Sequence, residues 1–134
     1  MYKIQKAYTG NTADRRFLRR EPAVITGKKG EKQCRIRPQD IYYFESVDEK
    51  LFACTKEEEY QVASTLAETE EKLESYGFFR CNKSFVVNIN RIVSVKSEMG
   101  NRIDAQLDNG EHIIISRRYA KKFRELLRGG NVNG

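Results

Sequence analysis

Short apolar runs separated by brief turns constrain the fold of this 134-residue chain more than any other feature of its sequence. Five such runs follow one another from Ala23 onward, and they read AVIT, QCRIR, IYYFES, LFACT and YQVA. Each has the length and the β-branched or aromatic content of a strand. Connections this short join antiparallel neighbours, because a parallel pair needs a crossover of a dozen or more residues. The first half therefore predicts an antiparallel sheet, with GKKGE (27–31) as its first turn.

A helix is predicted directly after these strands. Thr65 and Glu68 have the spacing of a capping box, which satisfies two backbone N–H groups at a helix start. Gly77 is well placed to end the helix, because glycine accepts the left-handed conformation that follows many helices. The apolar face would consist of Leu66, Thr69, Leu73 and Tyr76. One amphipathic helix should therefore cover part of the sheet.

The second half repeats the strand pattern and ends in another helix. RIVSV and RIDAQLD are predicted strands about the turn EMGN, and Asn109-Gly110 predicts a type I′ hairpin before the strand EHIII. A last helix is predicted from Tyr119 to Leu127. The fold class that follows is mainly β, with antiparallel strands in small packed sheets and one or two short helices.

The two ends of the chain are predicted to lie outside this fold. Residues 1–22 contain turn formers and a basic cluster, TGNTADRRFLRR, which favour a basic linker or arm; KIQKA near the start is typical of the end of an upstream domain. Residues 23–128 would form the folded domain. Residues 129–134, GGNVNG, would form a flexible tail.

The formal net charge of +6 is divided unevenly along the chain. Acidic residues dominate from Asp40 to Glu74. The charged residues are mostly or wholly basic in three other ranges, 15–37, 75–97 and 112–124. Blocks of one sign give a molecule a basic side and an acidic side, and a basic side suits a polyanionic partner. A solvated surface of uneven composition is the alternative interpretation.

Several function classes find no support in the sequence. Three cysteines at wide spacing and the single His112 make no zinc site, and no cofactor is expected. The sequence has no motif of nucleophilic catalysis and no phosphate-cradling glycine loop, so it does not predict an enzyme. No stretch approaches the roughly 20 apolar residues that span a bilayer, and no signal peptide is recognisable. We expect a soluble cytoplasmic protein with reduced thiols.

A polar kernel interrupts an apolar stretch just past the first predicted helix, in GFFRCNKSFVVNINRI (77–92). No carboxylate balances it between Glu74 and Glu98. Its members are Arg80, Asn82, Lys83 and Ser84. Asparagine bonds adenine, lysine and arginine bond guanine or phosphate, and serine donates to phosphate oxygens. The kernel is therefore predicted to contact DNA, although Asn82 and Ser84 could instead only close a turn.

A second candidate site starts the last helix, in ISRRYAKKFREL. Ser116 is a good N-cap, which puts Arg117 and Arg118 in the first helical turn, where the macrodipole disfavours cations. An anionic partner would explain them, because a helix start binds phosphate and arginine can also reach guanine. Lys121 and Lys122 would extend this surface along the helix. A solvated basic face is the alternative.

The turn SVDEK supplies a third candidate, in which Lys50 could reach a DNA groove beside the acidic Asp48 and Glu49. Cys81 lies within the basic kernel, and we hypothesise that this surrounding lowers its pKa and favours its oxidation; an inert thiol is the alternative. Asn88 is predicted to be structural, satisfying backbone groups where the chain turns toward RIVSV.

These motifs resemble those of the LytTR family, the DNA-binding output domains of bacterial response regulators of the AgrA and LytR type. The resemblance runs from Ala23 to Leu127 and rests on IYYFES, FFRCNKSFVVNINRI and IIISRRYAKKFREL. It implies a mainly antiparallel fold that binds DNA through loops entering successive major grooves. The base-contacting residues that it implies are Lys50, Asn82, Lys83, Arg117 and Arg118. Members of this family commonly follow an upstream receiver domain, so residues 1–22 would be the end of such a domain and a linker; a stand-alone relative is the alternative.

We therefore expect a sequence-specific regulator of transcription that binds double-stranded DNA with tandem half-sites, as a pair of protomers, in a bacterial two-component system. Two other interpretations stay open at this point. A small β domain could bind RNA or single strands by stacking bases on exposed aromatic side chains. A protein-interaction module could instead present its acidic block, from Asp40 to Glu74, to a basic partner.

Overall fold

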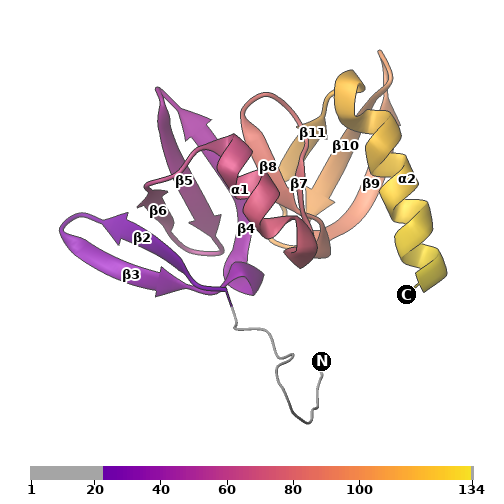
Figure 1. Ribbon diagram of the computed structural model, residues 1–134. Helices are drawn as coiled ribbons and strands as arrows, with labels where there is room; N and C mark the ends of the chain where they lie inside the picture. The colour runs from indigo at the N-terminus through magenta and orange to yellow at the C-terminus, as the bar shows by residue number, and fades with distance from the viewer. Residues whose placement is uncertain (1–22, 134) are drawn as a thin grey trace, which may run out of the picture.

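The computed structural model describes residues 23–133, and the predicted basic arm at 1–22 lies outside the described residues. The described chain forms two sheets and two α-helices (Figure 1). The seven-stranded sheet has the order β3-β2-β6-β5-β4-β8-β7, and the three-stranded sheet has the order β11-β10-β9. Every pairing in both sheets is antiparallel, which confirms the predicted fold class.

The elements have the following bounds. The larger sheet contains β2 (Ile25–Lys29), β3 (Lys32–Ile36), β4 (Ile41–Val47), β5 (Lys50–Thr55), β6 (Glu59–Val62), β7 (Phe78–Arg80) and β8 (Phe85–Asn88). The smaller sheet contains β9 (Ile92–Glu98), β10 (Arg102–Leu107) and β11 (His112–Ile115). The helices are α1 (Leu66–Leu73) and α2 (Arg117–Asn133), and 3-10 turns lie at η1 (Pro38–Asp40), η2 (Glu74–Tyr76) and η3 (Ile89–Arg91).

The first turn is shorter than predicted. Instead of turning at GKKGE, β2 continues through Gly27, and only Gly30 and Glu31 lie between the paired strands. A Cβ added to Gly27 would lie 2.6 Å from the Cβ of Tyr60 on β6. Gly27 therefore permits a close approach of two strands, whereas Gly30 takes a positive φ of 62° and makes the turn.

The first helix forms as the sequence predicts. The Thr65 hydroxyl accepts from the Glu68 amide (3.1 Å), and the Glu68 carboxylate accepts from the Thr65 amide (3.1 Å), which completes the capping box. Gly77 ends the following 3-10 turn with a φ of 92°. The side chains of Leu66 and Leu73 are buried against the larger sheet.

Two hydrophobic cores share the strands β7 and β8. Phe78 and Val86 pack into the core beneath α1, whereas their chain neighbours Phe79 and Val87 pack into a second core with the smaller sheet and α2. All four side chains are buried. Figure 1 shows α1 over the larger sheet and α2 over the smaller one. Because successive side chains alternate across a strand, β7 and β8 are fixed from both faces.

The predicted type I′ turn at Asn109-Gly110 is wrong, although the hairpin forms. A type I′ turn needs a positive φ at both central residues, and here Gly110 has a φ of 92° while Asn109 is not in the positive-φ region. The Asn109 side chain instead accepts from the Glu111 amide (2.9 Å), and the Gly110 amide donates to the Leu107 carbonyl (2.9 Å). The side-chain bond favours a longer loop with glycine as its left-handed residue.

The last helix is longer than predicted at both ends, because α2 runs from Arg117 to Asn133 rather than from Tyr119 to Leu127. Most of the predicted tail, 129–134, is therefore helical. Each residue added to an existing helix gains one backbone bond, which offsets the poor helix propensity of the two glycines. Neither described helix combines the length and the apolar character needed to cross a membrane.

Candidate nucleic-acid interface

Three connections lie along one edge of the molecule, which we call the upper edge: the β4–β5 turn, the β7–β8 loop and the β11–α2 junction (Figure 1). Backbone hydrogen bonds join them. The amide of Ser46 donates to the carbonyl of Ser84 (2.9 Å), and the amide of Ser116 donates to the carbonyl of Cys81 (2.9 Å). The β7–β8 loop is thus bonded to both neighbours, and the three candidate sites form one continuous surface.

The base of the β7–β8 loop is buried from solvent. Cys81 is fully buried, and its amide donates to the carbonyl of Phe85 (3.1 Å). Burial raises the pKa of the Cys81 thiol to about 12, and the nearby Arg80 guanidinium only partly opposes this. The hypothesis that the basic kernel lowers this pKa is therefore wrong, because desolvation of the thiolate outweighs the positive charge.

Arg80 turns inward across the loop. Its Nε donates to the carbonyl of Asn82 (2.8 Å) and its Nη2 to the carbonyl of Lys83 (3.0 Å). Its Nη1 lies 3.8 Å from a carboxylate oxygen of Glu70 on α1. The carboxylate that the kernel lacks in sequence is therefore supplied by the helix that precedes it. Local sequence gives no sign of this contact, because Glu70 points toward the loop only after the chain folds.

Asn82 is also bonded within the protein. Its side-chain Nδ2 donates to the carbonyl of Ile114 on β11 (2.9 Å), and its Oδ1 accepts from the amide of Ser84 (2.8 Å). The bond from the Ser84 amide closes the turn, which is the alternative role that the sequence allowed for Asn82. The first bond joins the kernel to the smaller sheet, at the strand that leads into α2.

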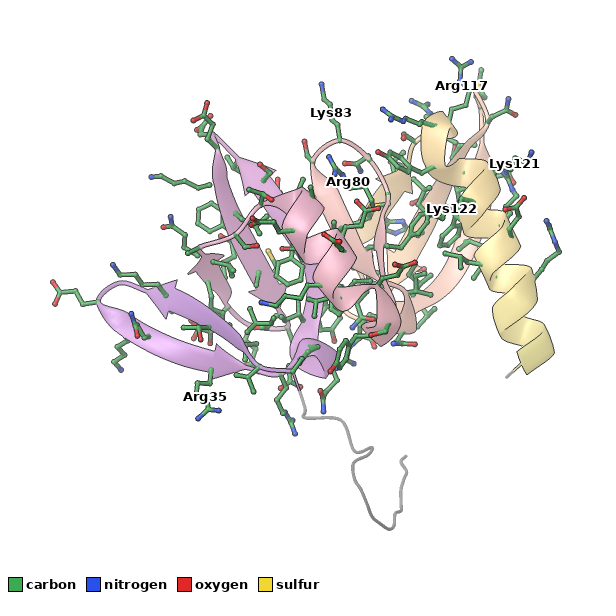
Figure 2. All side chains as sticks on the ribbon, in the orientation of Figure 1. Arg35, Arg80, Lys83, Arg117, Lys121 and Lys122 are labelled. Carbon is green, nitrogen blue, oxygen red and sulfur yellow. The ribbon has the colours of Figure 1, made fainter. Side chains whose placement is uncertain are left out.

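Lys83 and Ser84 complete the kernel. Lys83 is exposed at the tip of the loop and points away from the molecule at the upper edge (Figure 2). No described carboxylate pairs with its ammonium group. Ser84 is half-buried, and its backbone groups bond Asn82 and Ser46. The structure therefore presents Lys83 as the outward-pointing cation of the kernel.

The start of α2 adds two arginines to the same edge. The Ser116 carbonyl accepts from the Tyr119 amide (2.9 Å) directly before the helix begins at Arg117. Arg117 is exposed and points outward near the upper edge (Figure 2). The Arg118 guanidinium lies over the Tyr119 ring, 5.5 Å from its centroid, which limits the directions it can take.

The two lysines of α2 face different surroundings. Both Lys121 and Lys122 are exposed. Lys121 follows Arg117 by one turn and extends its face of the helix. Lys122 lines a groove between α1 and α2 together with Glu71 and Glu74. The structure therefore places Lys122 beside acidic side chains, away from the tip at Lys83 (Figure 2).

Lys50 begins β5 directly after a tight turn. Asp48 and Glu49 form that turn with positive φ values of 51° and 66°, which is the type I′ pattern. For residues other than glycine, this conformation is unfavourable by about 1 kcal/mol or more. Lys50 and both acidic residues are exposed, so this part of the upper edge carries mixed charge.

The opposite ends of the same strands form a lower edge, which contains a cluster of paired charges around Arg91. Arg91 in η3 contacts the Asp108 carboxylate (3.1 Å) and the Gln39 carbonyl (2.7 Å), and its guanidinium lies 4.7 Å from the centroid of the Tyr42 ring. The interaction between the Tyr42 hydroxyl and the Asp108 carboxylate raises the pKa of Tyr42 and, together with Arg91, lowers that of Asp108. This cluster joins the two sheets, and sequence reasoning missed it because its members come from three segments that are far apart in the chain.

The aromatic side chains form no stacking surface. Every described phenylalanine and tyrosine is buried or half-buried, and the large apolar side chains that are exposed are aliphatic. Tyr43 and Phe85, for example, pack against each other with ring centroids 5.4 Å apart. Among residues 23–133 there is also no cluster of histidine, cysteine, aspartate and glutamate suited to a metal ion.

Comparisons with known proteins agree with the resemblance seen in the sequence. A family model described as LytTr DNA-binding domain matches residues 31–128. A solved structure, the "LytTr DNA-binding domain of putative methyl-accepting/DNA response regulator from Bacillus cereus", superposes with a TM-score of 0.75 at 30% identity, covering 80% of this chain and 98% of that one.

Curated relatives include two kinds of regulator. The transcriptional regulatory protein YpdB of Escherichia coli O6:H1 is 32% identical over 124 residues, which are 92% of this chain and 51% of the relative. The sensory transduction protein LytT of Bacillus cereus is 34% identical over 90 residues, 67% of this chain and 37% of the relative. The chain thus spans about half the length, or less, of these relatives.

Proposed function

Since this chain belongs to the LytTR DNA-binding domain family, we propose that it binds double-stranded DNA in a sequence-specific manner and thereby regulates transcription. The upper edge would be its DNA-binding surface. The observation that carries this proposal is the joining of three cation-bearing connections into one edge by the bonds of Ser46 and Ser116. A rigid edge of this kind can present several side chains to DNA in a fixed relation.

The residues of this edge would divide between two roles. Lys83 and Arg117 point outward and are suited to reach base edges in the major groove, where lysine and arginine bond guanine. The remaining members would hold the phosphate backbone and set the register of the domain on DNA. These are Lys50, Ser84, Arg118, Lys121 and Lys122. Arg80 and Asn82 also belong to the surface, although their side chains bond the protein.

A duplex is favoured over single strands as the ligand. Proteins that bind single strands stack bases on exposed aromatic rings, and every described ring of this domain is buried or half-buried. Within the acidic segment from Asp40 to Glu74, the carboxylates of α1 lie on the face of the larger sheet, and only Asp48 and Glu49 of the β4–β5 turn lie at the upper edge (Figure 1).

In the cell, two protomers would bind tandem half-sites, each reading successive major grooves. The relatives are longer than this chain, and a preceding receiver domain would connect DNA binding to a signal in a cytoplasmic two-component system. The basic segment at 15–20 would then belong to the connection between the two domains.

Selection from a randomised duplex pool tests the proposal. The selected duplex should contain a repeated motif, and its affinity, measured by fluorescence anisotropy, should fall by orders of magnitude between about 50 and 200 mM salt. Arg118→Ala should weaken binding to the selected duplex and to scrambled DNA about equally, as expected of a phosphate contact, whereas a loss of about 1 to 3 kcal/mol confined to the selected duplex would assign Arg118 to a base. If no motif is enriched, the protein is not a sequence-specific regulator.

A further inference from the structure

Two members of the kernel bond the protein rather than solvent, and this distinguishes them from Lys83. We propose that Arg80 and Asn82 are positioning residues: they hold the β7–β8 loop in the shape that presents Lys83 to DNA, and neither side chain touches a base. This inference rests on the proposed function, because Lys83 must be a DNA contact for its position to matter.

The guanidinium of Arg80 is matched to the loop that it spans. Two consecutive carbonyls, those of Asn82 and Lys83, face inward and accept from Nε and Nη2 at 2.8 and 3.0 Å. A planar fork satisfies two acceptors at once, which a single ammonium group cannot do in the same geometry. Only 20% of the Arg80 side chain is exposed. A phosphate would therefore meet a mostly buried guanidinium, two of whose five N–H donors are already bonded to the loop.

The third nitrogen of Arg80 faces α1. Its distance of 3.8 Å from Glu70 is long for a hydrogen bond, and the Glu70 side chain is 41% exposed, so this contact orients the guanidinium more than it stabilises the fold. The negative charge beside Nη1 would also repel a DNA phosphate. Both effects favour an inward role for Arg80.

Asn82 fixes the loop relative to the second DNA-contacting segment. Its bond to the carbonyl of Ile114 (2.9 Å) and the backbone bond from Ser116 to Cys81 (2.9 Å) tie the loop to the residues that precede Arg117. Its remaining oxygen accepts from the Ser84 amide. The amide group is thus bonded at both ends, and reaching adenine would break both contacts.

A loop held in this way is ordered before DNA arrives. Binding then does not bear the entropy cost of immobilising the loop, which is the general benefit of preorganisation. If loss of the Arg80 contacts left the loop in its binding shape about a tenth of the time, affinity would fall about tenfold without loss of any DNA contact. A lost phosphate contact has a different signature, because it also lowers the salt dependence of binding.

Two matched substitutions separate the roles. Arg80→Gln and Lys83→Gln each remove one positive charge from the same loop. Lys83→Gln should weaken binding to the selected duplex about 5- to 150-fold and should weaken binding to a scrambled duplex much less, because it removes a base contact. Arg80→Gln should weaken binding about tenfold while leaving the slope of log affinity against log salt unchanged. In the DNA-free protein, Arg80→Gln should also speed hydrogen exchange at the Ser84 amide, which Lys83→Gln should not.

A rescue experiment adds a second criterion. Arg80→Lys restores the charge but not the two carbonyl bonds, so it should behave like Arg80→Gln. Asn82→Ala should likewise speed exchange at Ser84 and leave the salt slope intact. Asn82→Asp keeps the acceptor for Ser84 and loses the donor to Ile114, which provides a milder variant if the alanine substitution unfolds the domain. Urea unfolding of each variant establishes that the domain is folded.

Binding restored by Arg80→Lys, or a salt slope lowered by Arg80→Gln, would make Arg80 a phosphate contact and overturn the proposal. Unchanged exchange at Ser84 in both the Arg80 and the Asn82 variants would overturn it as well. Failure of the wild-type domain to select any duplex is a different result: it removes the proposed function and with it the role of positioning Lys83 for DNA. Exchange at Ser84 would then still report whether these residues order the loop.

Discussion

The upper and lower edges of the molecule differ in whether their cations have partners within the protein. At the lower edge, Arg91 is bonded to Asp108 and to a backbone carbonyl and lies over an aromatic ring. At the upper edge, Lys83 and Arg117 are exposed, and no described carboxylate pairs with them. Arg91 at the lower edge therefore helps to hold the two sheets together, whereas Lys83 and Arg117 at the upper edge remain available to a partner.

The same difference shows how a small domain can be both stable and strongly attracted to DNA. Exposed lysine and arginine cost little free energy in water, so the upper edge does not weaken the fold. Its shape is maintained by neutral backbone bonds, such as those of Ser46 and Ser116, and by Arg80 turned inward. Substitutions at the two edges should therefore separate binding from stability.

The largest effect is expected from the double variant Lys83→Ala with Arg117→Ala. Each side chain should contribute about 1 to 3 kcal/mol to binding, so the pair should weaken binding of the selected duplex by about 2 to 6 kcal/mol. The free energy of unfolding should change by less than about 0.5 kcal/mol, because neither side chain has a described partner. Anisotropy and urea unfolding measure the two quantities, and a comparable loss in both would contradict the division between the edges.

Asn88 should show the reverse behaviour. Only 2% of Asn88 is exposed; its Nδ2 donates to the Ile41 carbonyl (2.9 Å) and its Oδ1 accepts from the Asn90 amide (3.0 Å). The structural role predicted for Asn88 is thereby confirmed. Asn88→Ala leaves buried backbone groups unpaired and should lower the free energy of unfolding by about 1 to 3 kcal/mol. Below its unfolding transition the variant should bind DNA normally, and a specific loss of binding would assign Asn88 to the interface.

The β4–β5 turn tests how far the upper edge extends. Glu49→Gly should raise the free energy of unfolding by about 0.5 to 1 kcal/mol, because glycine accepts a φ of 66° without strain. It should also modestly strengthen DNA binding by removing a negative charge beside Lys50. Glu49→Gln is the matched control, which removes the charge and retains the strain. If both variants leave affinity unchanged, the turn does not approach DNA.

The smallest effect is expected for Asp108, a pH-dependent one confined to the lower edge. The Tyr42 hydroxyl and then Arg91 lower the pKa of Asp108 in the folded state, so the ionised carboxylate favours folding. This contribution is present above the pKa of the unfolded carboxyl and is lost as pH falls through the lowered, folded value. Acid titration of stability should therefore be shallower in Asp108→Asn than in the wild type. Coincident acid profiles would show that this carboxylate is not linked to folding.

Features coded by neighbouring residues could be predicted from the sequence, and features that need distant partners could not. The capping box at Thr65 and the mainly antiparallel fold follow from local spacing. The inward turn of Arg80 depends on carbonyls whose positions the folded loop sets, and the bond from Asn82 to Ile114 joins residues 32 apart. Local sequence showed Asn82 as a polar residue with two possible uses, and only the smaller sheet provides the acceptor.

The turns could be predicted only in part, because their conformation depends both on local residues and on the pairing of the strands that they connect. Asn109-Gly110 is the most favourable pair for a type I′ turn, yet the structure puts that conformation at Asp48 and Glu49. The register between β4 and β5 leaves two residues to connect Val47 with Lys50, so the pairing of the strands outweighs the preference of the residues.

The strands β7 and β8 lie between the two cores and contribute side chains to both. Phe78 and Val86 pack into one core, and Phe79 and Val87 pack into the other. Neither core can melt while the other persists, since each would lose one of its own faces. The domain should therefore unfold in a single cooperative step, without a partly open form that keeps some of its contacts to DNA. For a regulator, this makes occupancy of a promoter depend on the number of intact molecules and not on a range of partly active ones.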